Sequence, residues 1–328
     1  GEYEDFLARR PDWPGLPLLR EKGEEAVARS TDPARVIAWF AGGLPVTGKG
    51  ARAYVRALQA AGRMADAETE AMRAWAELSF TPEEEDALLA LAPDAVGFVH
   101  ELRLDNLLWS GRPGQANRML ARVPEDLRAL ARARIALQND EKGVTALIGA
   151  VPKARAGDAG LALDRFIWRM RRDLYDEALP LILERSASAD LLGRPEAWAE
   201  RRTTLTRWLM RQGRPAEAYR VAASHHLEAG PAYADLEFLA GFVALRRLDD
   251  PGTALKHFQH LLAGVSTPIS LARAHYWIGR AQEAAGQDGS ASYQAAAAHQ
   301  TAYYGLLAAE RLGMTLDAGV LTGTAAPD

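Results

Sequence analysis

The chain has 328 residues, no cysteine and a formal net charge of −4 at pH 7, and 48% of its residues are apolar. The absence of cysteine excludes disulfides, a thiol nucleophile and a Cys-ligated metal, and the weakly acidic charge provides no general attraction to nucleic acid or to an anionic membrane. The apolar content is sufficient for a folded core, but no apolar run approaches the roughly 18 residues that a membrane span requires. We therefore expect two compact domains or one elongated domain, with no nucleic-acid partner and no membrane span.

The first motif along the chain is GLPVTGKGARAY, from Gly43 to Tyr54, which has the G-x-x-x-x-G-K spacing of a phosphate-binding loop. In that loop a strand leads into a glycine-rich turn whose backbone N–H groups hold phosphate at a helix start, and a Ser or Thr binds magnesium. Here Gly50 occupies the Ser/Thr position. Asp32 followed by Pro33 indicates that a helix, and not a strand, precedes the motif. We interpret the segment as a loop between two helices.

Helical patterns account for most of the remaining chain, and strand patterns are nearly absent. In the stretch ARAYVRAL the apolar residues Tyr54, Val55 and Leu58 recur at helical spacing on one face. The stretch TPEE that begins at Thr81 predicts a helix start, because a hydroxyl caps free N–H groups, proline suits the first helical position and acidic residues favour the positive end of the helix dipole. The sequence therefore predicts an all-α fold.

A short pattern recurs at the expected corners between helices. Four segments match G-x-x-x-x-A and begin at Gly62, Gly111, Gly213 and Gly286, and two further corners keep only the final alanine, at Ala178 and Ala254. Glycine would end the first helix in a left-handed conformation, and a small alanine early in the second helix would let the two helices approach closely. One hairpin cannot bury its apolar face alone, so the hairpins must stack. We therefore expect a right-handed superhelix of stacked helical hairpins, an α-solenoid related to tetratricopeptide repeats that is curved or forms a ring.

Three stretches in order are similar to the superhelical region of the soluble lytic murein transglycosylases. They are FLARRPDWPGLPLLREKGEEAV (Phe6–Val27), ARAHYWIGRAQEAAGQ (Ala272–Gln287) and TAYYGLLAAERLG (Thr301–Gly313). In this family the Tyr-Tyr-Gly helix closes the superhelical, U-type domain that precedes the catalytic domain. The stretches RLDNLLWSGRPGQANRML and DRFIWRMRRDLYDEAL also resemble bacterial members, so the resemblance covers nearly the whole chain.

The resemblance implies a periplasmic scaffold that positions a lysozyme-like domain on peptidoglycan glycan strands, for cleavage of the β-1,4 bond between N-acetylmuramic acid and N-acetylglucosamine. The family's catalytic Glu-Ser motif and its Gly-Leu-Met-Gln stretch do not occur here, so no catalytic residue can be assigned by resemblance. We expect residues 1–313 to form the scaffold and residues 314–328 to be a flexible tail or linker towards a C-terminal catalytic domain of the same protein. The chain alone would then be no enzyme. The alternative is a free-standing solenoid adaptor for protein partners.

Two predicted helices combine arginine with tryptophan. The candidate glycan-binding residues are Arg165, Trp168, Arg169, Arg172, Arg201, Arg202 and Trp208. Sugars stack on aromatic faces and arginine binds carboxylates such as those of peptide stems, so these side chains could hold glycan strands. The competing interpretation, which the spacing favours, is a buried tryptophan stripe with arginine on the wet face.

The remaining polar residues indicate no catalytic or metal site. Carboxylates cluster at predicted helix starts, as in PEEED, where capping is their ordinary role. His257 and His260 share a helix face and His225 adjoins His226, but a zinc site needs three or four converging ligands and no pattern marks the others. We therefore interpret these histidines as structural or surface residues and expect neither metal nor cofactor.

Overall fold

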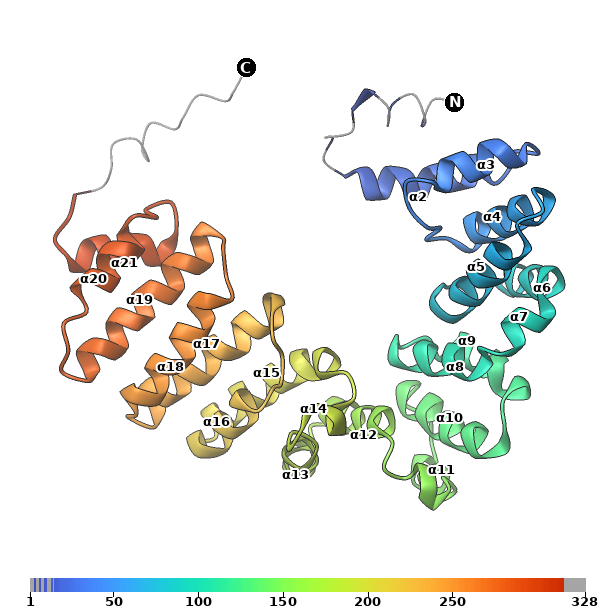
Figure 1. Cartoon of the computed structure of the whole chain (residues 1–328). Helices are drawn as coiled ribbons and strands as arrows, with labels where there is room; N and C mark the ends of the chain where they lie inside the picture. Colours follow the sequence, from blue (N-terminus) through green and yellow to red (C-terminus); the bar gives the residue numbers. More distant parts are fainter. Residues whose placement is uncertain (1–2, 4–5, 7–8, 11–12, 14, 316–328) are drawn as a thin grey trace. The chain divides into compact units, whose positions relative to one another are not determined.

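The computed structural model describes Tyr3, Phe6, Arg9, Arg10, Trp13 and residues 15–315. These residues form α-helices and two short 3-10 helices with no strand among them, which confirms the predicted all-α class (Figure 1). None of the described helices is long and apolar enough to cross a membrane. Apart from Met314 and Thr315, the predicted tail lies outside the described residues. The chain divides into two compact units, Gly1–Gly157 and Asp158–Asp328.

Short helices joined by tight corners make up the N-terminal unit. They are α2 (Leu16–Val27), α3 (Pro33–Phe40), α4 (Gly48–Ala60), α5 (Met64–Glu77), α6 (Pro82–Leu91), α7 (Pro93–Gly97), α8 (His100–Trp109), α9 (Pro113–Met119), α10 (Glu125–Gln138) and α11 (Val144–Gly149), with 3-10 helices at Leu120–Arg122 and Lys153–Arg155. Two predicted starts are confirmed, since Asp32 Oδ1 accepts the Ala34 N–H at 3.0 Å and Thr81 forms a reciprocal capping box with Glu84. The local sequence therefore sets where these helices begin.

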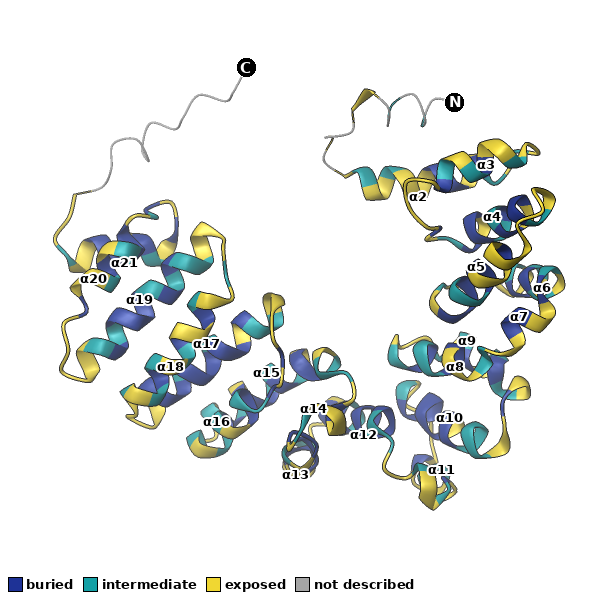
Figure 2. Cartoon of the chain, in the orientation of Figure 1, coloured by how far each residue is buried: buried dark blue, intermediate teal, exposed yellow. Residues whose placement is uncertain are grey.

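Longer helices form the C-terminal unit. They are α12 (Ala159–Arg171), α13 (Tyr175–Arg185), α14 (Ala189–Leu192), α15 (Pro195–Arg211), α16 (Pro215–Ala223), α17 (Gly230–Arg247), α18 (Pro251–Ala263), α19 (Pro268–Ala284), α20 (Ser290–Ala297) and α21 (Tyr303–Arg311). From α15 onward each helix packs against the next, and α15 also contacts α17, as α19 contacts α21. Figure 2 shows dark blue, buried residues on the faces that these helices turn toward one another.

A separate apolar core stabilises each unit. In the N-terminal unit Trp75 and Leu88 are completely buried among α4, α5, α6 and α8. In the C-terminal unit the Trp277 ring lies 5.4–5.8 Å from the rings of Phe238, Phe242 and Phe258. Burial of a large aromatic side chain contributes about 2–3 kcal/mol, so these clusters hold neighbouring hairpins together.

The predicted corners have the expected backbone conformation. Their glycines, Gly62, Gly111, Gly213 and Gly286, have φ between 62° and 75°. In the two corners without glycine, Asp173 and Asp249 adopt the same left-handed conformation, with φ of 57° and 53°. Aspartate tolerates this region better than most residues because its short polar side chain can bond locally. All six corners therefore contain one left-handed residue, and five share the same closing hydrogen bond, whereas in the Asp249 corner the Asp250 N–H donates one residue further back, to the Ala244 carbonyl.

The alanine of the corner pattern occupies the fourth position of the second helix in five cases. These residues, Ala67, Ala116, Ala178, Ala218 and Ala254, are each at most 1% exposed. The prediction was wrong for Ala291, which is exposed, because α20 begins only at Ser290 and its fourth residue is Tyr293. A Cβ on Gly279 would lie 2.8 Å from the Tyr293 ring. In this hairpin the small residue is therefore a glycine of the first helix.

Candidate functional site

The glycan-binding candidates of α12 and its C-terminal cap follow one face, since Trp168 and Arg169 each lie three or four residues from Arg165 and from Arg172. The Arg172 guanidinium lies over the Trp168 ring, 4.5 Å from its centroid. Arg169 forms a long ion pair with Glu177, with Nε and Oε2 3.7 Å apart. Partial burial, together with the charges of Arg169 and Arg185, lowers the pKa of Arg165. This face is therefore a half-exposed basic surface with one indole ring.

On α15 the candidates separate. Arg201 is half-buried beside Glu200, whereas Arg202 is completely buried. The Arg202 guanidinium donates to the carbonyl of Val221 at 2.6 Å and to the hydroxyl of Ser186 at 2.7 Å. These groups lie at the C-terminal ends of α16 and α13, where helices leave carbonyls without partners. Arg202 was therefore wrongly predicted as a glycan contact, because its side chain joins three helices inside the unit.

Trp208 stacks on Tyr175 of α13, with ring centroids 4.7 Å apart and an angle of 23° between the planes. The Arg214 guanidinium covers the same indole at 5.8 Å and bonds Asp176 and Glu217. Sequence reasoning missed Tyr175 and Arg214, although each begins or precedes a helix next to a predicted corner. The contacts thus form two groups, one around Trp168 and one around Trp208.

The G-x-x-x-x-G-K loop binds a carboxylate of its own chain. Glu24, which is buried, accepts hydrogen bonds from the backbone N–H groups of Val46 and Thr47 at 2.8 and 2.9 Å, and from the Thr47 hydroxyl. A Cβ on Gly50 would clash with this carboxylate, which explains the glycine. Lys49 pairs with Glu25 at 3.0 Å. Because the groups that would hold phosphate already have partners, the loop connects two helices, as predicted.

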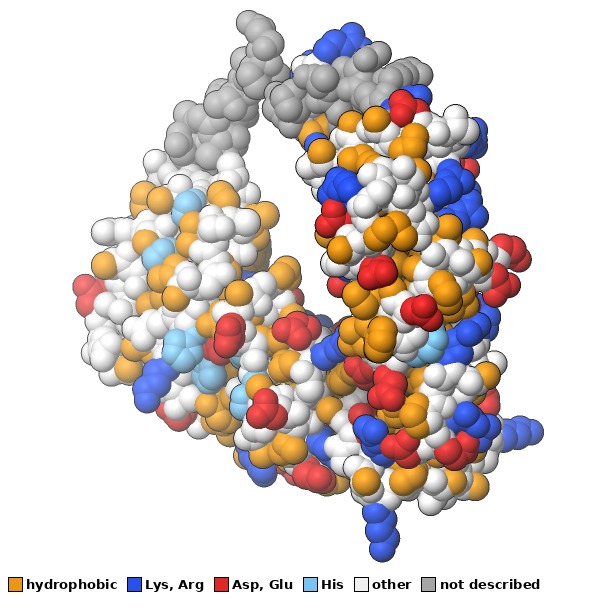
Figure 3. Space-filling view, turned by 45° about the vertical axis from the view of Figure 1, so that its right-hand side comes forward, with side chains coloured by type: hydrophobic (Ala, Val, Ile, Leu, Met, Phe, Trp, Pro, Cys, Tyr) orange, Lys and Arg blue, Asp and Glu red, His pale blue; other side chains and the backbone are white. Residues whose placement is uncertain are grey.

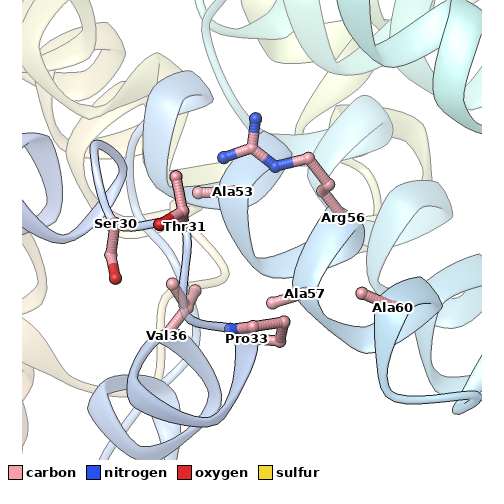
Figure 4. A pocket seen from close by; sticks show the side chains of 8 residues that line it. All are labelled: Ser30, Thr31, Pro33, Val36, Ala53, Arg56, Ala57 and Ala60. Carbon is pink, nitrogen blue, oxygen red and sulfur yellow. The ribbon is translucent and has the colours of Figure 1, made fainter.

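Two of the described cavities are lined mostly by uncharged residues, whereas a third, of about 330 Å³ beside the 43–54 loop, is lined by charged residues that include Glu25 and Lys49. One cavity of about 140 Å³ lies between α3 and α4, and Figure 4 shows alanines of α4 on one wall. Its lining residues are Ser30, Thr31, Pro33, Val36, Ala53, Arg56, Ala57 and Ala60. A second, of about 280 Å³, lies along α17 and the start of α19. Arg56 is the only charged residue that lines the cavity between α3 and α4, so this lining contains no pair of groups for acid–base catalysis.

A buried carboxylate surrounded by histidines is the most developed polar cluster of the C-terminal unit. Glu237 of α17 has a side chain only 7% exposed, and its Oε2 lies 2.7 Å from His257 Nδ1 and 3.5 Å from His260 Nδ1, both on α18. Its Oε1 lies 3.0 Å from Nε2 of His225, in the loop before α17. We call these four residues the Glu237 cluster. Sequence reasoning noted the histidines but had no signal for Glu237, which lies 20 residues before His257.

Hydrogen bonds determine how the protons of the cluster are arranged. The Leu227 N–H donates to His225 Nδ1 at 2.9 Å, so the His225 proton is on Nε2 and points at Glu237. His257 Nε2 lies 3.0 Å from the Tyr219 hydroxyl, and its Nδ1–H points at Glu237. Burial by itself would raise the pKa of Glu237, but the hydrogen bonds from His225 and His257 outweigh it and bring the pKa to about 2. The carboxylate is therefore ionised.

No protein-family model matches the chain, and a comparison with curated proteins finds no match either.

Proposed function

We propose that the chain is the non-catalytic superhelical scaffold region of a periplasmic peptidoglycan lytic transglycosylase. In this proposal it positions a lysozyme-like catalytic domain on murein glycan strands, and that domain cleaves the bond between N-acetylmuramic acid and N-acetylglucosamine. The observation that carries the proposal is the order and spacing of the three family-like stretches, which fall at the start of the chain, on α19 and on α21. The all-α fold is compatible with it.

Packing around α21 gives a physical reason for the Tyr-Tyr-Gly stretch. Tyr304 lies 5.4 Å from Tyr276 and 6.4 Å from Trp277, measured between ring centroids. A Cβ on Gly305 would clash with the backbone carbonyl of His299, so α21 can approach the preceding turn only with glycine there. The Tyr-Tyr-Gly stretch is therefore explained by close helix packing, which is the role that the resemblance implies for it.

The stacked hairpins support the finer architecture that we propose, a right-handed and curved α-solenoid. Within each unit, neighbouring described helices pack against one another and leave other faces to solvent, as in repeat proteins. The proposed glycan contacts are Arg165, Trp168, Arg169 and Arg172 on α12, with Arg201 and Trp208 on α15. Their arginines match the carboxylates of peptide stems, and the partly buried Trp168 indole offers a surface for a sugar ring, whereas the Trp208 ring is already stacked on Tyr175.

A pull-down on isolated sacculi tests the proposal. We expect the chain to sediment with sacculi, and the double variant Arg165→Ala/Arg169→Ala to bind about tenfold more weakly, since losing about 1.4 kcal/mol has that effect. The matched control is Arg246→Ala/Arg247→Ala, which removes the same charge from exposed positions on α17. Equal binding by the two double variants would contradict a specific basic surface, and no binding by the parent chain would favour the adaptor alternative.

The reading frame provides an independent test. The proposal expects the DNA after the codon for Asp328 to encode a Glu-Ser motif followed by Gly-Leu-Met-Gln. A stop codon there, together with capture of a defined protein partner, would instead support a free-standing adaptor.

A further inference from the structure

We propose that Glu237, His257 and His260 form a binding site for a divalent transition-metal ion, with Zn²⁺ as the best match. The inference concerns the Glu237 cluster alone and is independent of the proposed function. It rests on four features of the cluster: the kinds of ligand atom, their separation, the hydrogen bonds behind them, and the exposure of one side.

The ligand atoms are already close to metal-binding geometry. One ligand atom from each of Glu237, His257 and His260 lies within 4.8 Å of the other two. Around a tetrahedral Zn²⁺ with bonds of about 2.0–2.1 Å, ligand atoms lie about 3.3 Å apart. The 2.7 Å pair, Glu237 with His257, must therefore open slightly, whereas the 3.5 Å pair, Glu237 with His260, needs almost no change. Rotation of side chains can supply shifts of this size.

The helices hold these side chains in place. His257 and His260 are one turn apart on α18, so they project from the same face, and Glu237 lies on α17, which packs directly against α18. Carboxylate and imidazole ligands from facing helices recur in metal sites of helical proteins. The Phe258 ring, between the two histidines in sequence, packs where Gly241 leaves space, which fixes the rotation of α18 against α17.

The atoms behind the ligands fit a metal site as well. A ligating imidazole usually bonds through its other nitrogen, and a ligating carboxylate is usually hydrogen-bonded in turn. His257 Nε2 lies 3.0 Å from the Tyr219 hydroxyl, and Glu237 Oε1 accepts a hydrogen bond from His225. On metal binding the His257 proton would move from Nδ1 to Nε2, and Nε2–H would then donate to the Tyr219 oxygen. Both nitrogens of the imidazole would then have a partner.

One side of the cluster opens to water. The His260 side chain is 63% exposed, compared with 12% for His257. Figure 3 shows histidine side chains, in pale blue, at the surface of the C-terminal unit. An ion could therefore enter past His260, and three protein ligands leave a fourth position for water. Two imidazoles with one carboxylate suit Zn²⁺ or a neighbouring transition metal, whereas Mg²⁺ prefers oxygen ligands.

Titration calorimetry of the full, untagged chain with ZnCl₂ and with MgCl₂ tests this proposal. We expect one Zn²⁺ per chain, an upward shift of several degrees in the unfolding midpoint at saturating Zn²⁺, and no effect of Mg²⁺. The principal variant is His260→Ala, because an exposed side chain can be removed without damage to the core. It should weaken Zn²⁺ binding by at least about tenfold, since loss of an outer hydrogen-bond partner alone typically costs 10- to 100-fold.

The control variant is His299→Ala, which removes a histidine near His275 but outside the Glu237 cluster. It should leave Zn²⁺ affinity unchanged. The imidazole nitrogen resonances of His257 should report the shift of its proton from Nδ1 to Nε2 when Zn²⁺ is added. Unchanged affinity in His260→Ala, an equal loss in His299→Ala, or no stoichiometric binding by the parent chain would each overturn the proposal.

Discussion

Replacing Arg202 by methionine or by alanine separates the roles of its charge and of its volume. The guanidinium is completely buried and donates to Val221 and Ser186. Burial lowers its pKa to about 10, well below the usual arginine value, so the folded state disfavours the charged form by about 3 kcal/mol. Methionine removes that cost and keeps an apolar chain of similar length. It leaves two acceptors without a donor, at about 1–3 kcal/mol each. We therefore expect Arg202→Met to lie within about 3 kcal/mol of the parent in free energy of unfolding.

Arg202→Ala leaves the same two acceptors without a donor and also opens a cavity beside Trp198 and Leu205, which are both completely buried. Cavities of this kind cost about 2–5 kcal/mol. The free energy of unfolding of Arg202→Ala should therefore be about 3 kcal/mol lower than that of Arg202→Met. Urea unfolding followed by far-ultraviolet circular dichroism measures both free energies. If methionine proves as destabilising as alanine, the buried charge itself is required and the reasoning is refuted. Sacculus binding by the folded Arg202→Met variant should equal that of the parent.

Three further outcomes follow from the corners and the loop. Asp249→Gly should raise the free energy of unfolding by up to about 1 kcal/mol and Gly213→Ala should lower it by about 1 kcal/mol, because both residues have positive φ. The urea midpoints should therefore shift in opposite directions, and shifts in the same direction would contradict this reasoning. Gly279→Ala should cost about 1–3 kcal/mol by crowding Tyr293, and the cost should largely disappear in a Tyr293→Ala background, which a double-mutant cycle measures. Magnesium ATP should not shift the unfolding midpoint of the parent, since Glu24 occupies the loop N–H groups; a saturable shift would show that ATP displaces it.

The predictions that the structure confirms concern interactions between residues that are close together in sequence. The caps at Asp32 and Thr81, the left-handed glycines such as Gly62, and the helix–helix nature of the 43–54 loop each depend on atoms within about four positions of one another. A helix cap or a tight turn is formed by neighbouring residues and needs no contact with a distant helix. The exception is α20, which begins later than the corner pattern predicts. The Ser290 N–H donates to Asp288 Oδ1, and the helix starts at Ser290.

The sequence by itself determined the all-α class, the helix starts at Asp32 and Thr81 and the recurring hairpin corners, since these need only neighbouring residues. The tertiary structure alone decided which arginine of the pair Arg201 and Arg202 is buried, because a step of one residue turns a side chain by about 100° around the helix and periodicity does not show where the next helix packs. It also brought Glu237 to His257, residues that pair only when α17 and α18 pack together, and folded the loop that carries His225 back onto α17. Such contacts depend on how separate segments pack, so no spacing along the chain predicts them.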